Sequence, residues 1–176
     1  MNKLVLLAAL ALGTALAAPR AHAQSAPLRS ELIRDWAEQK AIMLAIADAM
    51  PADKFSYKTT PPQRDYGQQV MHVANGTMIY LQFMGAKTPP PAIARNASAK
   101  AEILKAFSDV YDYGTTVLSE QTDQSLMETI QTNQYLGVSS RARVFYFLLG
   151  HTWDIYGQMA VYLRLNGITP PRSQRP

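Results

Sequence analysis

The sequence predicts an all-α protein, a four-helix bundle that follows a cleaved signal peptide. Three observations support this prediction. The chain begins with a charged and then apolar segment of the kind that directs export, four later segments carry apolar side chains at helical spacing, and alternating strand patterns joined by tight turns are lacking. Four amphipathic helices of similar length can bury their apolar faces most simply against one another.

The predicted signal peptide comprises residues 1–23. Lys3 gives a positive start, residues 4–18 form an uncharged and mostly apolar run, and residues 21–23 offer an Ala-His-Ala cleavage site. The apolar run is shorter than the ~20 residues that span a bilayer, although an uncleaved anchor is the alternative. We therefore expect the domain of residues 24–176 to be periplasmic or secreted.

The composition excludes several classes of function. The chain has no cysteine, which excludes disulfides, a thiol nucleophile and a cysteine metal site. Loss of Lys3 and Arg20 with the signal peptide lowers the count of 17 Lys and Arg residues by two, against 13 Asp and Glu. Because the remaining excess is small and no basic run exists, we expect no binding of nucleic acid.

The first predicted helix covers residues 30–50. Ser30 is a suitable capping residue at its start, and Pro51 ends it. Charged residues lie on other sides of this helix than its apolar face. That face holds Leu32, Trp36, Met43, Ala47 and Met50.

The second predicted helix covers residues 61–85. Thr60 precedes two prolines, a combination typical of a helix start, and the proline-rich linker 87–91 cannot continue the helix. Residues 66–86 carry no charge unless His72 is protonated, so we expect burial over a wide arc. The stripes expected to be buried include the one formed by His72, Ile79 and Phe83.

The third predicted helix covers residues 98–120 and has the clearest helical spacing of apolar residues. Residues 121–137 are polar and irregular, with room for a short turn of helix at 126–130. This long connection and the proline linker leave the up-and-down order of the helices open. The stripe of the third helix holds Ile103, Leu104, Phe107, Val110, Tyr111, Val117 and Leu118.

The fourth predicted helix covers residues 140–166. Gly167 and the prolines that follow it form a typical helix end. Residues 144–163 are long and apolar enough for a membrane span to be considered, but polar side chains inside them favour a core helix, so we expect no stable membrane span. Those polar residues are His151, Asp154 and Gln158.

His72, His151 and Asp154 together predict a metal site. His72 and His151 both lie on predicted apolar faces, and bundles build metal sites from side chains that project inward from facing helices. Asp154 follows His151 by three residues, so both can reach one point, and a buried carboxylate is costly unless it is paired or coordinated. The alternatives are that each histidine is a core residue, and that Asp154 orients the His151 ring or faces solvent.

The end of the chain resembles the last helix of the DinB/YfiT-like family. That helix has the pattern His-x-x-x-His-x-Gly-Gln, followed by Tyr-Leu-Arg and a Gly-x-x-Pro-Pro end, and residues 151–171 read HTWDIYGQMAVYLRLNGITPP. Residues 60–72 resemble the second helix of the family, which carries its first metal-binding histidine, and residues 100–107 resemble the third.

The resemblance implies a four-helix bundle, often a homodimer, that holds zinc or nickel through three histidines. Some members of the family transfer low-molecular-weight thiols or isomerise thiol adducts, which implies a small-molecule substrate. His72 and His151 match the first two ligands, whereas Ile155 occupies the third position and cannot coordinate.

Two hypotheses follow from this departure. Asp154 can take the place of the third ligand, which would give a two-histidine, one-carboxylate site in a metal-dependent transferase or hydrolase-like enzyme. Alternatively, the site is degenerate, and the protein is a non-catalytic binding or scaffold bundle.

Overall fold

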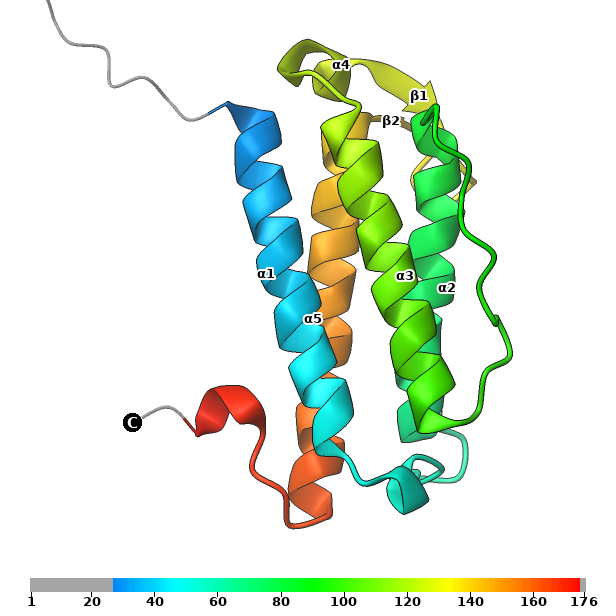
Figure 1. Cartoon of the computed structure of the whole chain (residues 1–176), viewed down its shortest axis with the longest axis vertical. Helices are drawn as coiled ribbons and strands as arrows, with labels where there is room; N and C mark the ends of the chain where they lie inside the picture. Colours follow the sequence, from blue (N-terminus) through cyan, green and yellow to red (C-terminus); the bar gives the residue numbers. More distant parts are fainter. Residues whose placement is uncertain (1–26, 175–176) are drawn as a thin grey trace, which may run out of the picture.

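Four long helices form the bundle in the computed structural model, which describes residues 27–174 (Figure 1). They are α1 (Leu28–Ala49), α2 (Tyr66–Leu81), α3 (Lys100–Ser119) and α5 (Arg141–Leu165). The predicted all-α class and bundle architecture are confirmed. The predicted signal peptide lies outside the described residues, and within them no helix is long and apolar enough to cross a membrane.

The helices are arranged in a down-up-up-down order. Around the bundle, α1 contacts α3 and α5, and α2 contacts the same two helices. The neighbours α2 and α3 are parallel because the connection of residues 85–99 runs the length of the bundle along its outside (Figure 1). The sequence left this order open, since it shows the length of a connection but not its path.

A carboxylate fixes the upper end of this crossover. Glu120, at the end of α3, accepts hydrogen bonds from the Lys87 amide at 2.5 Å, the Thr88 amide at 3.1 Å and the Thr88 hydroxyl at 2.6 Å. The bonds from Thr88 and Lys87 lower the pKa of Glu120. Further down, the Asn75 side-chain amide donates to the Arg95 carbonyl at 3.2 Å, which ties the crossover to α2.

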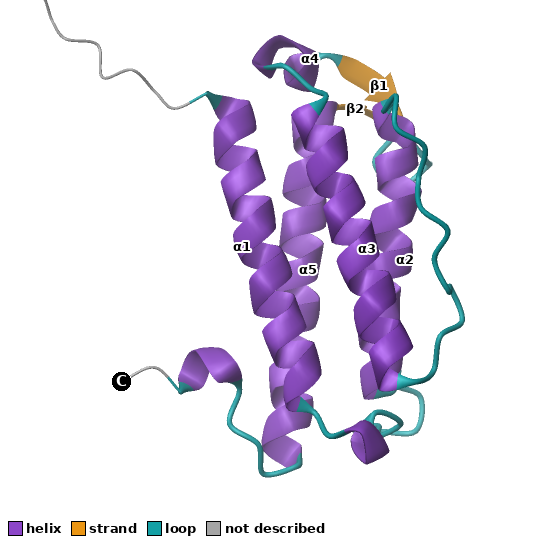
Figure 2. Ribbon diagram, viewed as in Figure 1, coloured by secondary structure: helices purple, strands orange, loops and turns teal. Residues whose placement is uncertain are grey.

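Residues 121–140 are more regular than the sequence predicts. They form the short helix α4 (Asp123–Met127) and a two-stranded antiparallel hairpin of β1 (Thr129–Gln131) and β2 (Val138–Ser140), with Ile130 opposite Ser139. Figure 2 shows these strands at one end of the bundle. Strands of three residues are too short to give an alternating pattern, so the sequence does not predict them.

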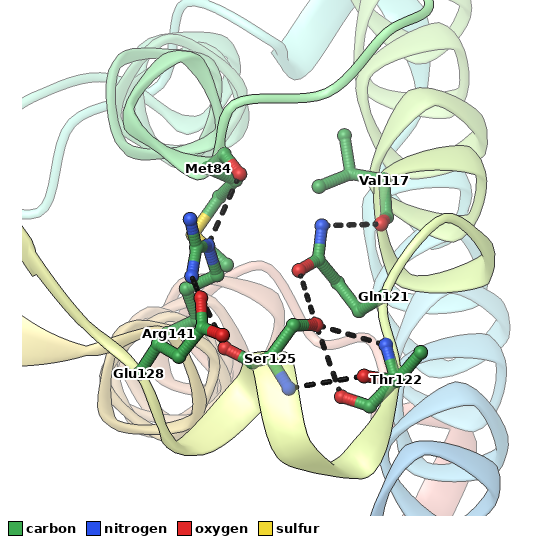
Figure 3. A network of polar contacts seen from close by, with 7 residues as sticks. All are labelled: Met84, Val117, Gln121, Thr122, Ser125, Glu128 and Arg141. Atoms are coloured by element: carbon green, nitrogen blue, oxygen red, sulfur yellow. Dashed lines mark hydrogen bonds and ion pairs between the residues drawn. The ribbon is translucent and has the colours of Figure 1, made fainter.

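Arg141 links the hairpin and α4 to the turn that follows α2. Its guanidinium donates to the Met84 carbonyl at 3.3 Å and the Ser125 carbonyl at 3.1 Å, and it pairs with Glu128 at 2.9 Å (Figure 3). The Ser125 hydroxyl also donates to the Gln121 side chain at 2.9 Å. This network holds the irregular segment onto the bundle.

Two predicted helix caps, Thr60 and Ser30, are wrong. The second helix begins at Tyr66 because Asp65 and Gln68 form a capping box, with the Gln68 amide donating to Asp65 at 2.7 Å. Thr60 and the prolines after it form a turn instead. The first helix begins at Leu28, with Pro27 rather than Ser30 at its N-cap.

The last helix has the predicted ends. The Ser140 hydroxyl accepts from the Arg143 amide at 3.2 Å, which caps the start of α5. At the other end Gly167 adopts a φ of 73°, and the amide of Ile168 donates back to Leu163 at 2.9 Å. This is the glycine-terminated helix end that the sequence indicates.

Trp36 lies at the centre of the core. Its ring is fully buried, stacks on Tyr111 with 4.4 Å between ring centres, and meets the edge of Phe145 at 5.5 Å. The indole nitrogen donates to the Tyr111 carbonyl at 2.8 Å. α3 can approach this ring because residue 114 is glycine.

The wide buried arc predicted for the second helix is only partly correct. Val70, Val73 and Leu81 are fully buried, but Ile79 is 42% exposed. His72 and Phe83, which share its stripe, are half-buried. The stripe lies at the edge of the core because α2 packs only against α3 and α5 among the long helices described.

Candidate functional site

The two histidines meet across the contact between α2 and α5. The ring centres of His72 and His151 are 5.0 Å apart, and the ring planes are nearly perpendicular at 83°. Both side chains are half-buried. The two helices are antiparallel neighbours. A second contact between them lies close to the histidines, where the Gln69 side chain donates to Gln158 at 3.0 Å. The predicted convergence of His72 and His151 is present.

Aromatic rings flank the pair on the side toward the hairpin. The Phe147 ring is parallel to the His151 ring, with 6.1 Å between centres. Tyr80 meets Phe147 at 4.9 Å, and Tyr135 meets it at 5.4 Å. These rings form an apolar wall beside His151.

Amides and a carboxylate flank the pair on the other side. The Gln158 side chain accepts from Gln69 at 3.0 Å and from Gln63 at 3.2 Å, and it donates to Asp154 at 3.3 Å. Asp154 is exposed, and within residues 27–174 it has no hydrogen bond to His151. It therefore faces solvent at the edge of the site and does not orient the His151 ring.

The surroundings favour neutral imidazoles. Burial is the main cause that lowers the pKa of His72, and the positive charges of Arg64 and His151 lower it further, whereas Asp154 opposes them. Burial also lowers the pKa of His151, against the opposing effect of Asp154. Since a metal ion binds the neutral ring, both residues are suited to ligation.

The third ligand position is not filled. Ile155, one helical turn after His151, is 2% exposed and belongs to the core. Within residues 27–174, no three His, Asp or Glu side chains are arranged so that they could hold a metal ion. His72 and His151 thus fit two positions of a metal site. Asp154 would have to turn toward them, or solvent would have to supply the remaining ligands.

A pocket of about 670 Å³ lies on the other side of His72. Its wall comes from the start of α2, the loop after Phe55 and the lower end of the crossover, and it includes Arg64, Arg95 and Asn75. Sequence reasoning missed this pocket. Arg64 precedes α2 in the chain, but nothing in the sequence places residue 95 at the same pocket.

The geometry defines a class of protein: a four-helix bundle with facing histidines on its second and last long helices. The chain belongs to the DinB superfamily, whose family model matches residues 12–159. No curated protein shows a significant sequence match to it.

Two solved structures share the fold. A DinB-like protein from Bacillus cereus aligns with a TM-score of 0.71 at 19% identity, covering 81% of this chain and 95% of the other. A DinB-like protein from Bacillus subtilis aligns with a TM-score of 0.64 at 13% identity, covering 83% and 99%. At such identities the similarity establishes the fold alone.

Proposed function

We propose that this DinB-superfamily protein binds zinc or nickel through His72 and His151, with Asp154 as third ligand, and acts on a small molecule as a transferase or hydrolase-like enzyme. The observation that carries the proposal is the pair of half-buried imidazoles 5.0 Å apart on facing helices. Two histidines and a carboxylate form a ligand set that leaves positions open for substrate.

The residues around the pair have separate roles in this proposal. A bound divalent ion would supply Lewis acidity, which lowers the pKa of a bound water or of a substrate thiol. Because the chain has no cysteine, the nucleophile must come from solvent or from the substrate. Phe147 and Tyr80 would exclude water on one side, and the Asp154 carboxylate would turn from its contact with Gln158 toward the pair.

The alternative is a non-catalytic binding or scaffold bundle with a degenerate metal site. One observation favours it: the buried Ile155 stands where the family resemblance expects the third histidine. The two hypotheses differ in whether the unmodified protein binds a metal ion.

Metal analysis of protein purified from its native compartment tests the proposal, together with calorimetric titration of zinc and nickel. We expect binding that is lost in His72→Ala and His151→Ala and weakened in Asp154→Ala. Asp35→Ala, which removes an exposed carboxylate from α1, serves as the matched control. Absence of metal from the native protein, with no binding in titration, would favour the scaffold hypothesis.

The proposal includes export. Its support is the charged and apolar pattern of residues 1–23, although the family match extends back to residue 12. Intact-mass measurement of the protein from the periplasm or medium should give a chain that begins at Gln24. A mature chain that retains Met1 would contradict cleavage.

The proposal also includes a homodimer formed through the outer face of α5. Gly150 and Gly157 lie on this face with no atom within 4 Å of an added Cβ, so another helix could approach closely. A face with these properties can pair with its own copy about a two-fold axis. Its exposed apolar side chains are Tyr146, Trp153, Val161 and Leu165.

Light scattering at micromolar concentration tests the dimer. We expect a dimer for the native chain and a monomer for Val161→Glu, which places a charge on the face. Arg34→Glu, an exposed substitution on α1, should remain dimeric. A monomeric native protein would contradict the proposal.

A further inference from the structure

The pocket beside His72 has the size of a small-molecule site. Its volume of about 670 Å³ lies within the range of roughly 300–1,000 Å³ that is usual for ligand pockets. It is open to solvent on one side. Residues from α2, from the loop that precedes this helix and from the crossover contribute to its wall, so three separate segments of chain converge there.

Two arginines in this wall have free head groups. Within residues 27–174, neither the Arg64 nor the Arg95 guanidinium has a hydrogen-bond or ion-pair partner. Their main chains are nevertheless fixed: the Arg64 carbonyl accepts from the Tyr162 hydroxyl at 2.5 Å, and the Arg95 carbonyl accepts from Asn75 at 3.2 Å. By contrast, the Arg141 guanidinium is engaged in the network at the hairpin, where it donates to two carbonyls and pairs with Glu128.

The balance of charge in the pocket is positive. Asp65 is the one acidic residue that lines it, and its carboxylate already accepts the Gln68 amide at 2.7 Å in the helix cap. Because α2 and α3 are parallel, both helices begin at this end of the bundle (Figure 1). α3 begins after Ala99 without a side-chain cap, so its first amides add partial positive charge.

We propose that this pocket binds the carboxylate or phosphate group of a small molecule through Arg64 and Arg95. The planar fork of a guanidinium matches either anion with two parallel hydrogen bonds.

This inference also names a substrate class for the proposed metal-dependent function. That part of the inference rests on the proposed function. His72 lines the pocket and faces His151 at its other side. A ligand whose anionic group lies on the arginines can therefore extend toward the histidine pair. The substrate would be a small organic anion with its reacting group a few bonds from the carboxylate or phosphate.

Titration calorimetry of the full mature chain, freed of metal by a chelating resin, tests the proposal with inorganic phosphate and with malate as probes. Arg64→Gln and Arg95→Gln should each weaken binding by about tenfold or more, the effect of losing one charge-assisted pair. Arg34→Gln removes an exposed guanidinium from α1 and should bind as the native protein does. Tighter binding of malate would identify a hydroxy-carboxylate, and tighter binding of phosphate would identify a phosphate ester.

The proposal is overturned if the native protein binds neither probe, or if both arginine variants bind as tightly as the native protein. His151→Ala separates it from the proposed function, because His151 does not line the pocket. That variant should lose metal binding and keep the binding of anions. Anion binding by a protein that never binds metal would sustain this inference and contradict the metal site.

Discussion

Ile155 follows His151 by one helical turn, yet the isoleucine is 2% exposed in the core while the histidine is half-buried at its edge. Residues four apart on a helix lie on the same side, about 40° from one another. A side chain at position 155 is therefore close in direction to His151 but deeper in the bundle. This difference in depth determines how a histidine at position 155 would affect metal affinity and the stability of the fold.

Ile155→His is expected to bind zinc or nickel at least about tenfold more tightly than the native chain, because ligand changes commonly alter affinity by that factor or more. Without metal, the buried imidazole lacks a partner and should destabilise the fold by about 1–3 kcal/mol. Calorimetry and thermal unfolding with and without metal measure both effects. Ile155→Gln is the control. It should lose the same stability as Ile155→His, and adding metal should not restore that stability. Equal affinity in Ile155→His and the native chain would mean that position 155 does not reach the pair.

Acid should destabilise the metal-free protein through His72 and His151. Their pKa values are lowered in the fold from 6.5, chiefly by burial, with Arg64 adding to and Asp154 opposing this effect. The unfolded chain therefore takes up protons first as the pH falls, and stability is lost below the unfolded pKa. Urea unfolding between about pH 7.5 and 5.5 should show this loss, and a His72→Gln, His151→Gln double variant should lose less. An identical pH dependence in both proteins would contradict the prediction.

Gly114→Ala should destabilise the core. An added Cβ would lie 2.3 Å from the Cζ2 atom of Trp36, and the hydrogen bond to Tyr111 holds that ring in place. Overpacking of this kind costs about 1–3 kcal/mol or more. Gly76→Ala is the matched control on α2, where nothing lies within 4 Å and the helix should gain up to about 1 kcal/mol. Urea unfolding of the two variants should give changes of opposite sign.

Glu120→Gln should loosen the upper end of the crossover. The charged carboxylate binds the amides of Lys87 and Thr88, and an amide side chain accepts these bonds more weakly. The protection factors of the amides at residues 87–88, which compare their exchange with the intrinsic rate at each pH, should fall in the variant. In the native chain they should fall only as the pH drops below 4.5, because the pKa of Glu120 is lowered. Glu102→Gln, an exposed change near the start of α3, should leave this exchange unaltered.

The helices could be predicted from the sequence because each buries a face at regular spacing. On α3, for example, the buried residues Ile103, Phe107 and Val110 follow one another at intervals of four and three, which only a helix places on one side. The start of α2 could not be predicted from Thr60 and its prolines, since the capping box of Asp65 and Gln68 competes with them and determines the boundary. Where two local helix-start signals are of similar strength, the packing of the chain that follows determines at which of them the helix begins.

The meeting of His72 and His151 could be predicted because both stand on apolar stripes, which helices of a bundle turn toward one another. The solvent-facing position of Asp154 could not, since residues three apart differ enough in direction to fall on either side of a helix edge. The arginine pocket was also beyond prediction. It depends on the path of the crossover, and that path is fixed by contacts such as the one between Asn75 and Arg95.

The two tryptophans give the protein two natural fluorescent reporters. Trp36 is fully buried between α1 and α3, so it should emit at short wavelength and resist quenching by acrylamide. Trp153 is 41% exposed on α5, beside Asp154 and beneath the guanidinium of Arg172 at 5.0 Å, so it should be readily quenched. Quenching can thus follow events at the outer face of α5 separately from unfolding of the core, without any label.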